Sequence, residues 1–211
     1  MATAVTDGLW ACLKSFPMLN YLTISDSSID FPPSPPELPS ITELSTYGVT
    51  SQCYEGLISS LPALVYIKIT IDDAEGDIAF ITAGLRRTGG QNLTRINLHT
   101  LYSLPSEKSH VSSKTMRGLG LLIKEHTKNL KYLTLYRVKC TDEGDLVYLI
   151  ECCRHVKTME RVKLWHCGTM SNGRVDSHLQ RLYTKSLNDL HLYVSHDDSL
   201  GEHNYSITHI D

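Results

Sequence analysis

Apolar and polar residues alternate in a short phrase that recurs along the chain. Its clearest copy, residues 130–140, is LKYLTLYRVKC, with leucines at the first, fourth and sixth positions and polar or aromatic residues between them. Alternation with a period of two directs one set of side chains to a buried side of a sheet and the other set to an open side. The phrase therefore predicts a short strand that is buried on one side only.

Six further copies of this phrase make the chain a repeat array. The first residues of the seven copies are Leu19, Ile41, Leu64, Leu93, Leu130, Met159 and Leu187. Neighbouring copies begin 22 to 37 residues apart. Of the fourteen residues at the fourth and sixth positions, thirteen are aliphatic, and only Thr46 departs. Such regularity indicates one structural unit repeated along the chain.

The segments between the predicted strands have helical periodicity. In the clearest ones apolar residues recur near i, i+3, i+4 and i+7, at Leu9, Cys12, Leu13 and Phe16, at Met116, Leu119, Leu122 and Ile123, and at Leu146, Leu149, Ile150 and Cys153. Weaker examples are Leu57, Ile58 and Leu61, then Ile78, Ile81 and Leu85, then Val175, Leu179 and Leu182. Neither the strand nor the helix of a unit buries its apolar side alone. We therefore expect an α/β fold, with an inner parallel sheet and an outer layer of helices.

Two segments and the tail interrupt this regularity. Residues 31–39, FPPSPPELP, contain five prolines and predict an extended or polyproline return in place of a helix. The polar residues 102–114 are expected to form a loop inserted after a strand. The polar residues 195–211 contain no further copy of the phrase and are expected to be a C-terminal cap or a flexible tail. One domain, residues 1–211, accounts for the pattern.

Composition narrows the classes of partner. The net charge of −3 and the pI near 6.3 give no reason to expect nucleic acid or an anionic membrane as a partner. No signal peptide and no stretch of 18 apolar residues occurs, so no membrane contact is expected. The six cysteines fall mostly at apolar positions and are interpreted as reduced thiols, with Cys152 the best candidate for an exposed one. These features favour a cytoplasmic protein.

Candidate chemistry is sparse. No nucleophile elbow, zinc-protease motif or phosphate-binding loop occurs, so we expect no catalytic residue and no cofactor. A zinc site would have to draw on Cys140, Cys152, Cys153, His155, His166 and Cys167, whose spacing contains no C-x-x-C pair. Buried structural thiols are the preferred interpretation. The acidic residues Asp72, Asp73, Glu75 and Asp77 are interpreted as a polar turn and helix start instead of a metal site.

Repeats of 28 or 29 residues that alternate strand and helix resemble the ribonuclease-inhibitor type of leucine-rich repeat. Residues 53–69, CYEGLISSLPALVYIKI, and residues 142–164, DEGDLVYLIECCRHVKTMERVKL, are similar to the C-terminal repeat region of NACHT and leucine-rich-repeat (NOD-like) receptors. The resemblance implies a curved solenoid of about seven repeats with the sheet on its concave side. It also implies a ligand-sensing or autoinhibitory role in intracellular innate immunity. At the ninth position, where this family usually has Asn or Cys, only Cys167 conforms.

The expected binding site lies on the concave face near the C-terminal end of the array. The seventh positions, predicted to form one column, are Ser25, Tyr47, Thr70, His99, Tyr136, Trp165 and Tyr193. The candidate contact residues are Tyr132, Tyr136, Arg137, Arg161, Lys163, Trp165, His166, His191 and Tyr193. Tyr, Trp and Arg together are typical of protein-binding hot spots. Equally, such side chains can stabilise a solvated sheet by packing across strands.

Two other functions fit the same pattern. The chain could be the substrate-recognition arm of a ubiquitin-ligase adaptor of the F-box type. It could also be an extracellular receptor module, which only the glycosylation triplets at Asn92 and Asn204 support. Under the preferred interpretation the partner is a protein or microbial ligand on the concave face, or another domain of the parent receptor.

Overall fold

Seven strands form one parallel sheet in the order of the sequence. The computed structural model describes residues 3–25, 35–101, 104–167 and 191–195. The strands of the sheet are β1 (Tyr21–Ile24), β2 (Glu43–Thr46), β3 (Tyr66–Ile71), β4 (Arg95–Thr100), β6 (Tyr132–Tyr136), β8 (Arg161–Trp165) and β9 (His191–Ser195). Each strand pairs with the next of these in parallel. The predicted parallel sheet is confirmed.

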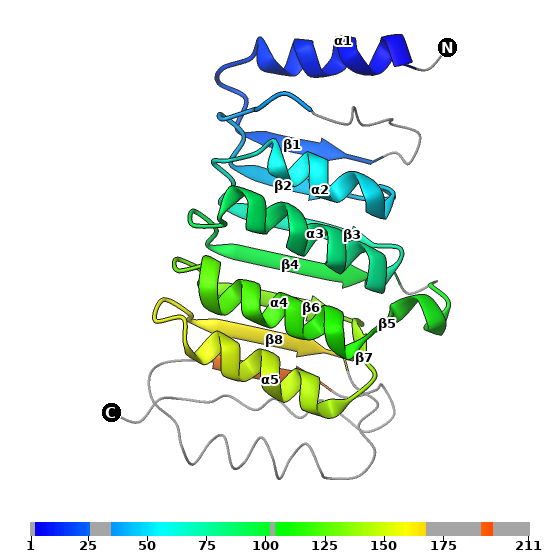
Figure 1. Cartoon of the computed structure of the whole chain (residues 1–211), viewed down its shortest axis with the longest axis vertical. Helices are drawn as coiled ribbons and strands as arrows, with labels where there is room; N and C mark the ends of the chain where they lie inside the picture. The colour runs from blue at the N-terminus through cyan, green and yellow to red at the C-terminus, as the bar shows by residue number, and fades with distance from the viewer. Residues whose placement is uncertain (1–2, 26–34, 102–103, 168–190, 196–211) are drawn as a thin grey trace.

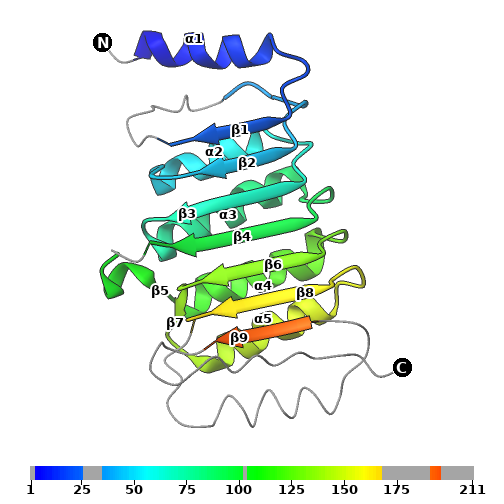
Figure 2. The ribbon, with the colours of Figure 1, turned by 180° about the vertical axis from the view of Figure 1, so that it is seen from behind.

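Helices cover one side of this sheet. They are α2 (Ser51–Ser59), α3 (Ala74–Thr88), α4 (Ser113–His126) and α5 (Glu143–Arg154), which lie in front of the strands in Figure 1. Viewed from behind, in Figure 2, the strands lie in front and no described helix covers them. A further helix, α1 (Thr3–Lys14), lies beyond β1 at the N-terminal end (Figure 1). The fold is therefore an α/β fold of two layers.

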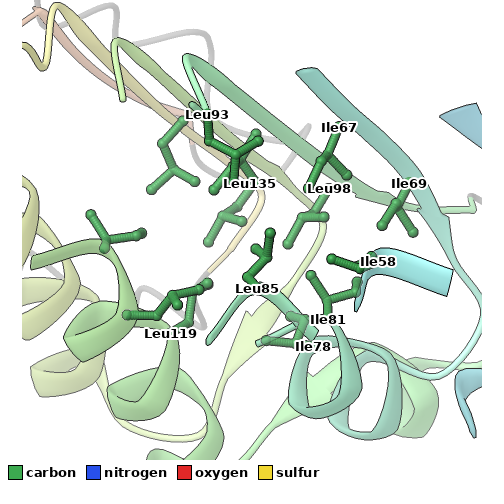
Figure 3. Close-up of a cluster of buried hydrophobic side chains, with 14 of the residues drawn as sticks. Ile58, Ile67, Ile69, Ile78, Ile81, Leu85, Leu93, Leu98, Leu119 and Leu135 are labelled. Carbon is green, nitrogen blue, oxygen red and sulfur yellow. The ribbon is translucent and has the colours of Figure 1, made fainter. Parts of the chain in front are cut away.

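The core lies between the sheet and the helices. In β1 to β8 every residue at the fourth and sixth positions of the phrase is buried. Figure 3 shows such side chains, among them Ile67, Leu98 and Leu135 of the sheet, next to Ile81 and Leu119 of the helices. The aliphatic positions that identified the repeat are thus the ones that remove apolar surface from water.

Thr46, the one polar residue in this set, has a partner in the core. Its Oγ1 lies 3.1 Å from the hydroxyl oxygen of Tyr54 in α2, and both side chains are buried. Burial raises the pKa of Tyr54 above its ordinary value, so this hydroxyl stays protonated and can share a hydrogen bond. The pair satisfies two polar groups that would otherwise be costly to bury.

Neighbouring helices pack closely where one of them has a glycine. A Cβ placed on Gly84 of α3 would lie 2.9 Å from Cβ of Ile58 in α2. A Cβ on Gly120 of α4 would lie 3.1 Å from a ring carbon of Tyr148 in α5. The missing side chains therefore let the helices approach, because protein interiors leave no room for an extra methyl group without rearrangement.

The last strand lies two residues later in the sequence than predicted. A phrase beginning at Leu187 would place Tyr193 beside Trp165, whereas the structure pairs Trp165 with Ser195 and Lys163 with Tyr193. A shift by two residues keeps the same side of a strand facing the core. The alternation continues through Val194, so the apolar pattern allows both registers and could not choose between them.

The expected loop at 102–114 contains short regular elements. Among its described residues are a 3-10 helix, η1 (Ser106–Ser109), and a short strand, β5 (His110–Val111), which pairs with β7 (Lys139–Cys140). The helix α4 begins inside this stretch, because the hydroxyl of Ser112 accepts a hydrogen bond from the amide of Thr115 and caps the helix. The insertion lies between β4 and α4, as predicted, but it is not a loop throughout.

The other interruptions are partly outside the described residues. Residues 26–34 of the proline-rich return are not described, and residues 35–42 contain neither helix nor strand. The helix expected around residues 175–182 and the tail after residue 195 also lie outside the described part of the chain.

The apolar stripe predicted for the first helix was wrong. In α1 Trp10 is buried, whereas Cys12 is exposed, and Phe16 lies beyond the helix with 53% of its surface exposed. Cys152, the best candidate for an exposed thiol, is buried like the structural thiols of the preferred interpretation, and its sulfur lies 3.2 Å from where a Cβ on Gly120 would sit. The reason is that α5 packs against α4 as well as against the sheet, so two flanks of α5 are covered.

Candidate functional site

One side of the sheet is covered by no described helix, and we call this side the open face (Figure 2). The pairing register of the strands aligns the residues that face this side into columns. The third positions of the phrase align as Tyr21, Glu43, Tyr66, Arg95, Tyr132 and Arg161, and Arg161 pairs with His191 of β9. The fifth positions align as Thr23, Ser45, Lys68, Asn97, Thr134 and Lys163, and Lys163 pairs with Tyr193 of β9. Parallel pairing in register therefore brings residues from distant repeats side by side.

Arg95 lies between two tyrosine rings in the first of these columns. Its guanidinium carbon is 5.3 Å from the ring centroid of Tyr66 and 4.9 Å from that of Tyr132. Both distances are within the range of a cation–π contact, and the two rings come from the strands on either side of β4. The rings hold this exposed cation in place on the sheet.

Tyr132 also belongs to a charged group at the edge of the open face. Its hydroxyl donates a hydrogen bond to Glu160 over 2.5 Å, and the ammonium of Lys131 lies 2.8 Å from the other carboxylate oxygen. These two donors hold the pKa of Glu160 below its ordinary value. The carboxylate of Glu160 is therefore balanced by Lys131.

An aromatic cluster occupies the ends of β6 and β8. The ring centroids of Tyr136 and Trp165 are 6.1 Å apart, and those of Tyr136 and His166 are 5.6 Å apart in an edge-on arrangement. The ammonium of Lys163 lies 5.6 Å from the Trp165 ring. These contacts are the cross-strand packing expected of neighbouring aromatic side chains. They also place three large rings and a cation in one area of the open face.

The residues that follow these two strands have an unusual backbone. Arg137 has a φ of 56° and His166 a φ of 54°, both in the left-handed region, which costs a residue with a side chain about 1 kcal/mol or more. Gly48, which is also at the eighth position of its phrase, follows β2 and has a φ of 67°. The amide of Arg137 donates to the carbonyl of Trp165 over 2.7 Å. The imidazole of His166, which follows β8, packs edge-on against Tyr136.

His99 sits in the same column as Tyr136, one strand towards the N-terminus. Its Nε2 lies 2.8 Å from the hydroxyl of Thr70 on β3. Burial, reinforced by the nearby ammonium of Lys68, lowers the pKa of His99 below its ordinary value. The side chain is therefore held neutral in the folded chain near pH 7.

The structure brings the predicted contact residues together. Five of them occupy outward positions of two adjacent strands: Tyr132, Tyr136, Arg161, Lys163 and Trp165. Arg137 and His166 directly follow these strands. On the adjacent β9, His191 pairs with Arg161 and Tyr193 pairs with Lys163. Whether these residues contact a partner stays a prediction.

Sequence reasoning missed two residues of the open face. Tyr66 and Arg95 stack with Tyr132, and of these three residues only Tyr132 is among the predicted contact residues. The signal that could have found them is the third-position column, in which Tyr66, Arg95, Tyr132 and Arg161 alternate ring and cation along the repeats.

The cysteines are free thiols. Cys140, Cys152, Cys153 and Cys167 are buried, Cys53 is partly buried, and Cys12 is exposed. Burial raises the pKa of the Cys167 thiol to about 12, and this thiol donates to the carbonyls of Leu135 and Trp165, each over 3.3 Å. Within the described residues no three His, Cys, Asp or Glu side chains come together as a metal site.

The acidic residues near α3 support helix starts. Asp73 precedes the first residue of α3, and one carboxylate oxygen of Asp77 accepts hydrogen bonds from the amides of Asp72 and Asp73. Glu75 accepts from the amide and hydroxyl of Ser112 at the start of α4. The contacts fit the interpretation as a polar turn and helix start.

A shallow hollow lies beside this turn. It has a volume of about 330 Å³ and is lined by residues 48–52, Asp72, Asp73 and Lys108. Its charged lining contains two carboxylates and one ammonium group. These charges favour neither an anionic nor a cationic ligand. No predicted contact residue lines it.

Two further observations bear on the cellular setting. None of the described helices has the length and apolar character needed to cross a lipid bilayer. Asn92 of the first glycosylation triplet is exposed in the turn before β4, and its amide donates to the carbonyl of Pro62 over 3.4 Å. Asn204 lies outside the described residues.

Comparison of the chain with family models, with curated proteins and with solved structures gave no match. The functional argument therefore depends on the chain's own residues.

Proposed function

We propose that this chain is a leucine-rich repeat recognition module that binds a protein partner on the open face of its sheet. The proposed architecture is a curved solenoid with the sheet on the concave side. Its support is the sequential order of the parallel strands, the layer of described helices on one side, and the recurrence of the apolar phrase at the first six strands of this sheet.

The observation that carries the proposal is the cluster at the ends of β6 and β8. The rings of Trp165 and His166 each lie within contact distance of the Tyr136 ring, and all three residues are partly exposed. Rigid aromatic side chains bury a large area on binding and lose little conformational entropy. A partner that covers this cluster would remove the remaining ring surface from water.

The resemblance to NOD-like receptors suggests how such binding would act. In this proposal the module belongs to an intracellular receptor of innate immunity and catalyses no reaction. Contacts on the open face favour one state of the parent receptor, and a ligand or a neighbouring domain shifts the balance by binding one state more tightly. The ligand would be a protein or a microbial molecule.

The experiment compares two pairs of aromatic substitutions on the same face. The test variant is Tyr136→Ser with Trp165→Ser. The matched control is Tyr21→Ser with Tyr47→Ser, because both tyrosines are about half exposed, at 49% and 53%, at the other end of the sheet. Each protein is immobilised, incubated with cell extract and analysed by quantitative mass spectrometry. Thermal unfolding followed by circular dichroism shows whether each variant is folded.

The proposal predicts that proteins captured by the wild type and by the control are lost from the folded test variant. An identical set of proteins on all three would contradict it. If the test variant does not fold, the single substitution Trp165→Phe, which keeps a ring in place, provides the comparison.

A further inference from the structure

Charge is distributed unevenly over the sheet. From β3 to β8 the outward strand positions number twelve, three on each of four strands, and four of them are cations: Lys68, Arg95, Arg161 and Lys163. None of the twelve is acidic, although the whole chain has a net charge of −3. The nearby carboxylate of Glu160 is paired with Lys131 and also interacts electrostatically with Arg161. This part of the open face is therefore positive on a chain that is negative overall.

Aromatic rings hold two of these cations. Arg95 is stacked between Tyr66 and Tyr132, and Lys163 lies over Trp165. A stacked guanidinium keeps its planar edge, with its N–H donors, directed away from the ring faces. The rings restrict the motion of the Arg95 side chain before binding. Binding of an anionic group to the guanidinium edge therefore costs less conformational entropy. The geometry suits carboxylates, which accept two parallel hydrogen bonds from one guanidinium.

We propose that the partner of the open face is an acidic protein segment in extended conformation that crosses the strands from β3 to β8. This inference rests on the proposed function and adds the chemistry of the partner. Carboxylate side chains of the segment pair with Arg95 and Arg161, and the ring cluster at Tyr136 and Trp165 packs against its apolar atoms.

The strand spacing sets the spacing of the carboxylates. Arg95 and Arg161 occupy the same column two strands apart, and neighbouring strands are about 4.8 Å apart, so their Cα atoms are separated by roughly 10 Å. A segment in the extended polyproline II conformation advances about 3.1 Å per residue and completes a turn every three residues, so every third side chain lies on the same side. Acidic residues at every third position of the segment therefore meet the two arginines.

Single-stranded nucleic acid is the competing anionic partner, and the ring geometry disfavours it. Bases bind such proteins by stacking on open aromatic faces. The rings of Tyr66 and Tyr132 each have Arg95 over one face. These rings position a cation, which suits a carboxylate chain better than a row of bases.

The experiment measures binding of a fluorescent peptide of repeated Glu-Ser-Ser triplets to the full chain by anisotropy. The test variant is Arg161→Glu with Lys163→Glu. The matched control is Lys124→Glu with Lys128→Glu, which changes the net charge equally at exposed lysines of α4 and the turn after it. A peptide of repeated Lys-Ser-Ser triplets and oligothymidylate serve as competing probes.

The wild type and the control are expected to bind the Glu-Ser-Ser peptide, with affinity that falls as salt is raised. The test variant is expected to bind it about tenfold or more weakly at low salt. No binding by the wild type, an equal loss in the control, or preference for oligothymidylate would each overturn the inference. Tyr132→Phe, which keeps the ring under Arg95 and removes only the hydroxyl, gives a second variant expected to retain peptide binding.

The outcome separates this inference from the function on which it rests. If the Tyr136 and Trp165 substitutions abolish capture of cellular proteins while the charge reversal leaves that capture intact, the open face binds a partner that is not acidic. In that case the recognition function stands and the inference about the partner falls.

Discussion

The two sides of the sheet differ in what their side chains do, although both come from the same strands. On the helix side, the fourth and sixth positions from β1 to β8 are buried and, except for Thr46, aliphatic. On the open face, alternate residues of the same strands include rings, cations and hydroxyls that are partly exposed. The comparison teaches that the period of two lets one strand supply core on one side and a variable surface on the other.

The largest effect is expected on the helix side. Leu135→Ala removes a fully buried side chain and leaves a cavity, which should lower the free energy of unfolding by about 2–5 kcal/mol. Thr134→Ala, one residue away on the open face, should change it by less than about 0.5 kcal/mol. Urea denaturation measures both. Similar losses of unfolding free energy from the two substitutions would show that the helix side and the open face of the sheet do not differ in burial.

The next effect concerns the packing of the helices. Gly84→Ala places a methyl group 2.9 Å from Cβ of Ile58 and should lower the free energy of unfolding by about 1–3 kcal/mol. Gly118→Ala in α4 meets only the end of Arg86, at 4.0 Å, and should raise stability by up to about 1 kcal/mol through helix propensity. A stabilising Gly84→Ala would contradict the close approach of α2 and α3.

A smaller effect is expected at the turns that border the open face. Arg137→Gly relieves a left-handed backbone and should raise the free energy of unfolding by up to about 1 kcal/mol. Gly48→Ala, at the matching turn after β2, introduces the same strain and should lower it by about 1 kcal/mol. Thermal unfolding of both variants provides the measurement. If both substitutions changed the free energy of unfolding in the same direction, the two turns would not share the left-handed backbone.

The smallest effect is a pH dependence on the open face. The pKa of His99 is lower in the folded chain than in the unfolded chain, where it is about 6.5, because burial and then the ammonium of Lys68 disfavour the charged form. The stability gained from neutral His99 is complete above about pH 6.5 and is lost as pH falls through its folded pKa. His99→Gln should reduce the fall in thermal midpoint between about pH 7.5 and pH 5. An unchanged fall would show that other groups cause it.

The inward positions could be predicted because they have to be apolar at a fixed period. The strands β1, β2, β3, β4, β6 and β8 therefore lie where the phrase places them, and Gly89 follows the last residue of α3 with a positive φ, as expected of a helix C-terminal glycine. The register of β9 could not be predicted, because a shift of two residues exposes the same side of the strand.

The remaining differences between the sequence predictions and the structure come from contacts between repeats, which the pattern within one repeat does not predict. Cys152 is buried because α4 and α5 pack together at Gly120, which its position on α5 alone could not indicate. The stack of Arg95 with Tyr66 and Tyr132 needs three strands in register. Local periodicity predicts the elements, and the alignment of distant repeats decides the surface that the elements present.

The two tryptophans give the most direct test of binding on the open face, because Trp165 lies on that face and Trp10 is 2% exposed in α1. The chain labelled with 5-fluorotryptophan is titrated with the Glu-Ser-Ser peptide and followed by fluorine NMR, with Trp165→Phe assigning the signals. We predict that the Trp165 signal shifts during the titration while the Trp10 signal stays in place. A shift of the Trp10 signal alone, or no shift of either signal, would contradict binding of an acidic segment at the open face.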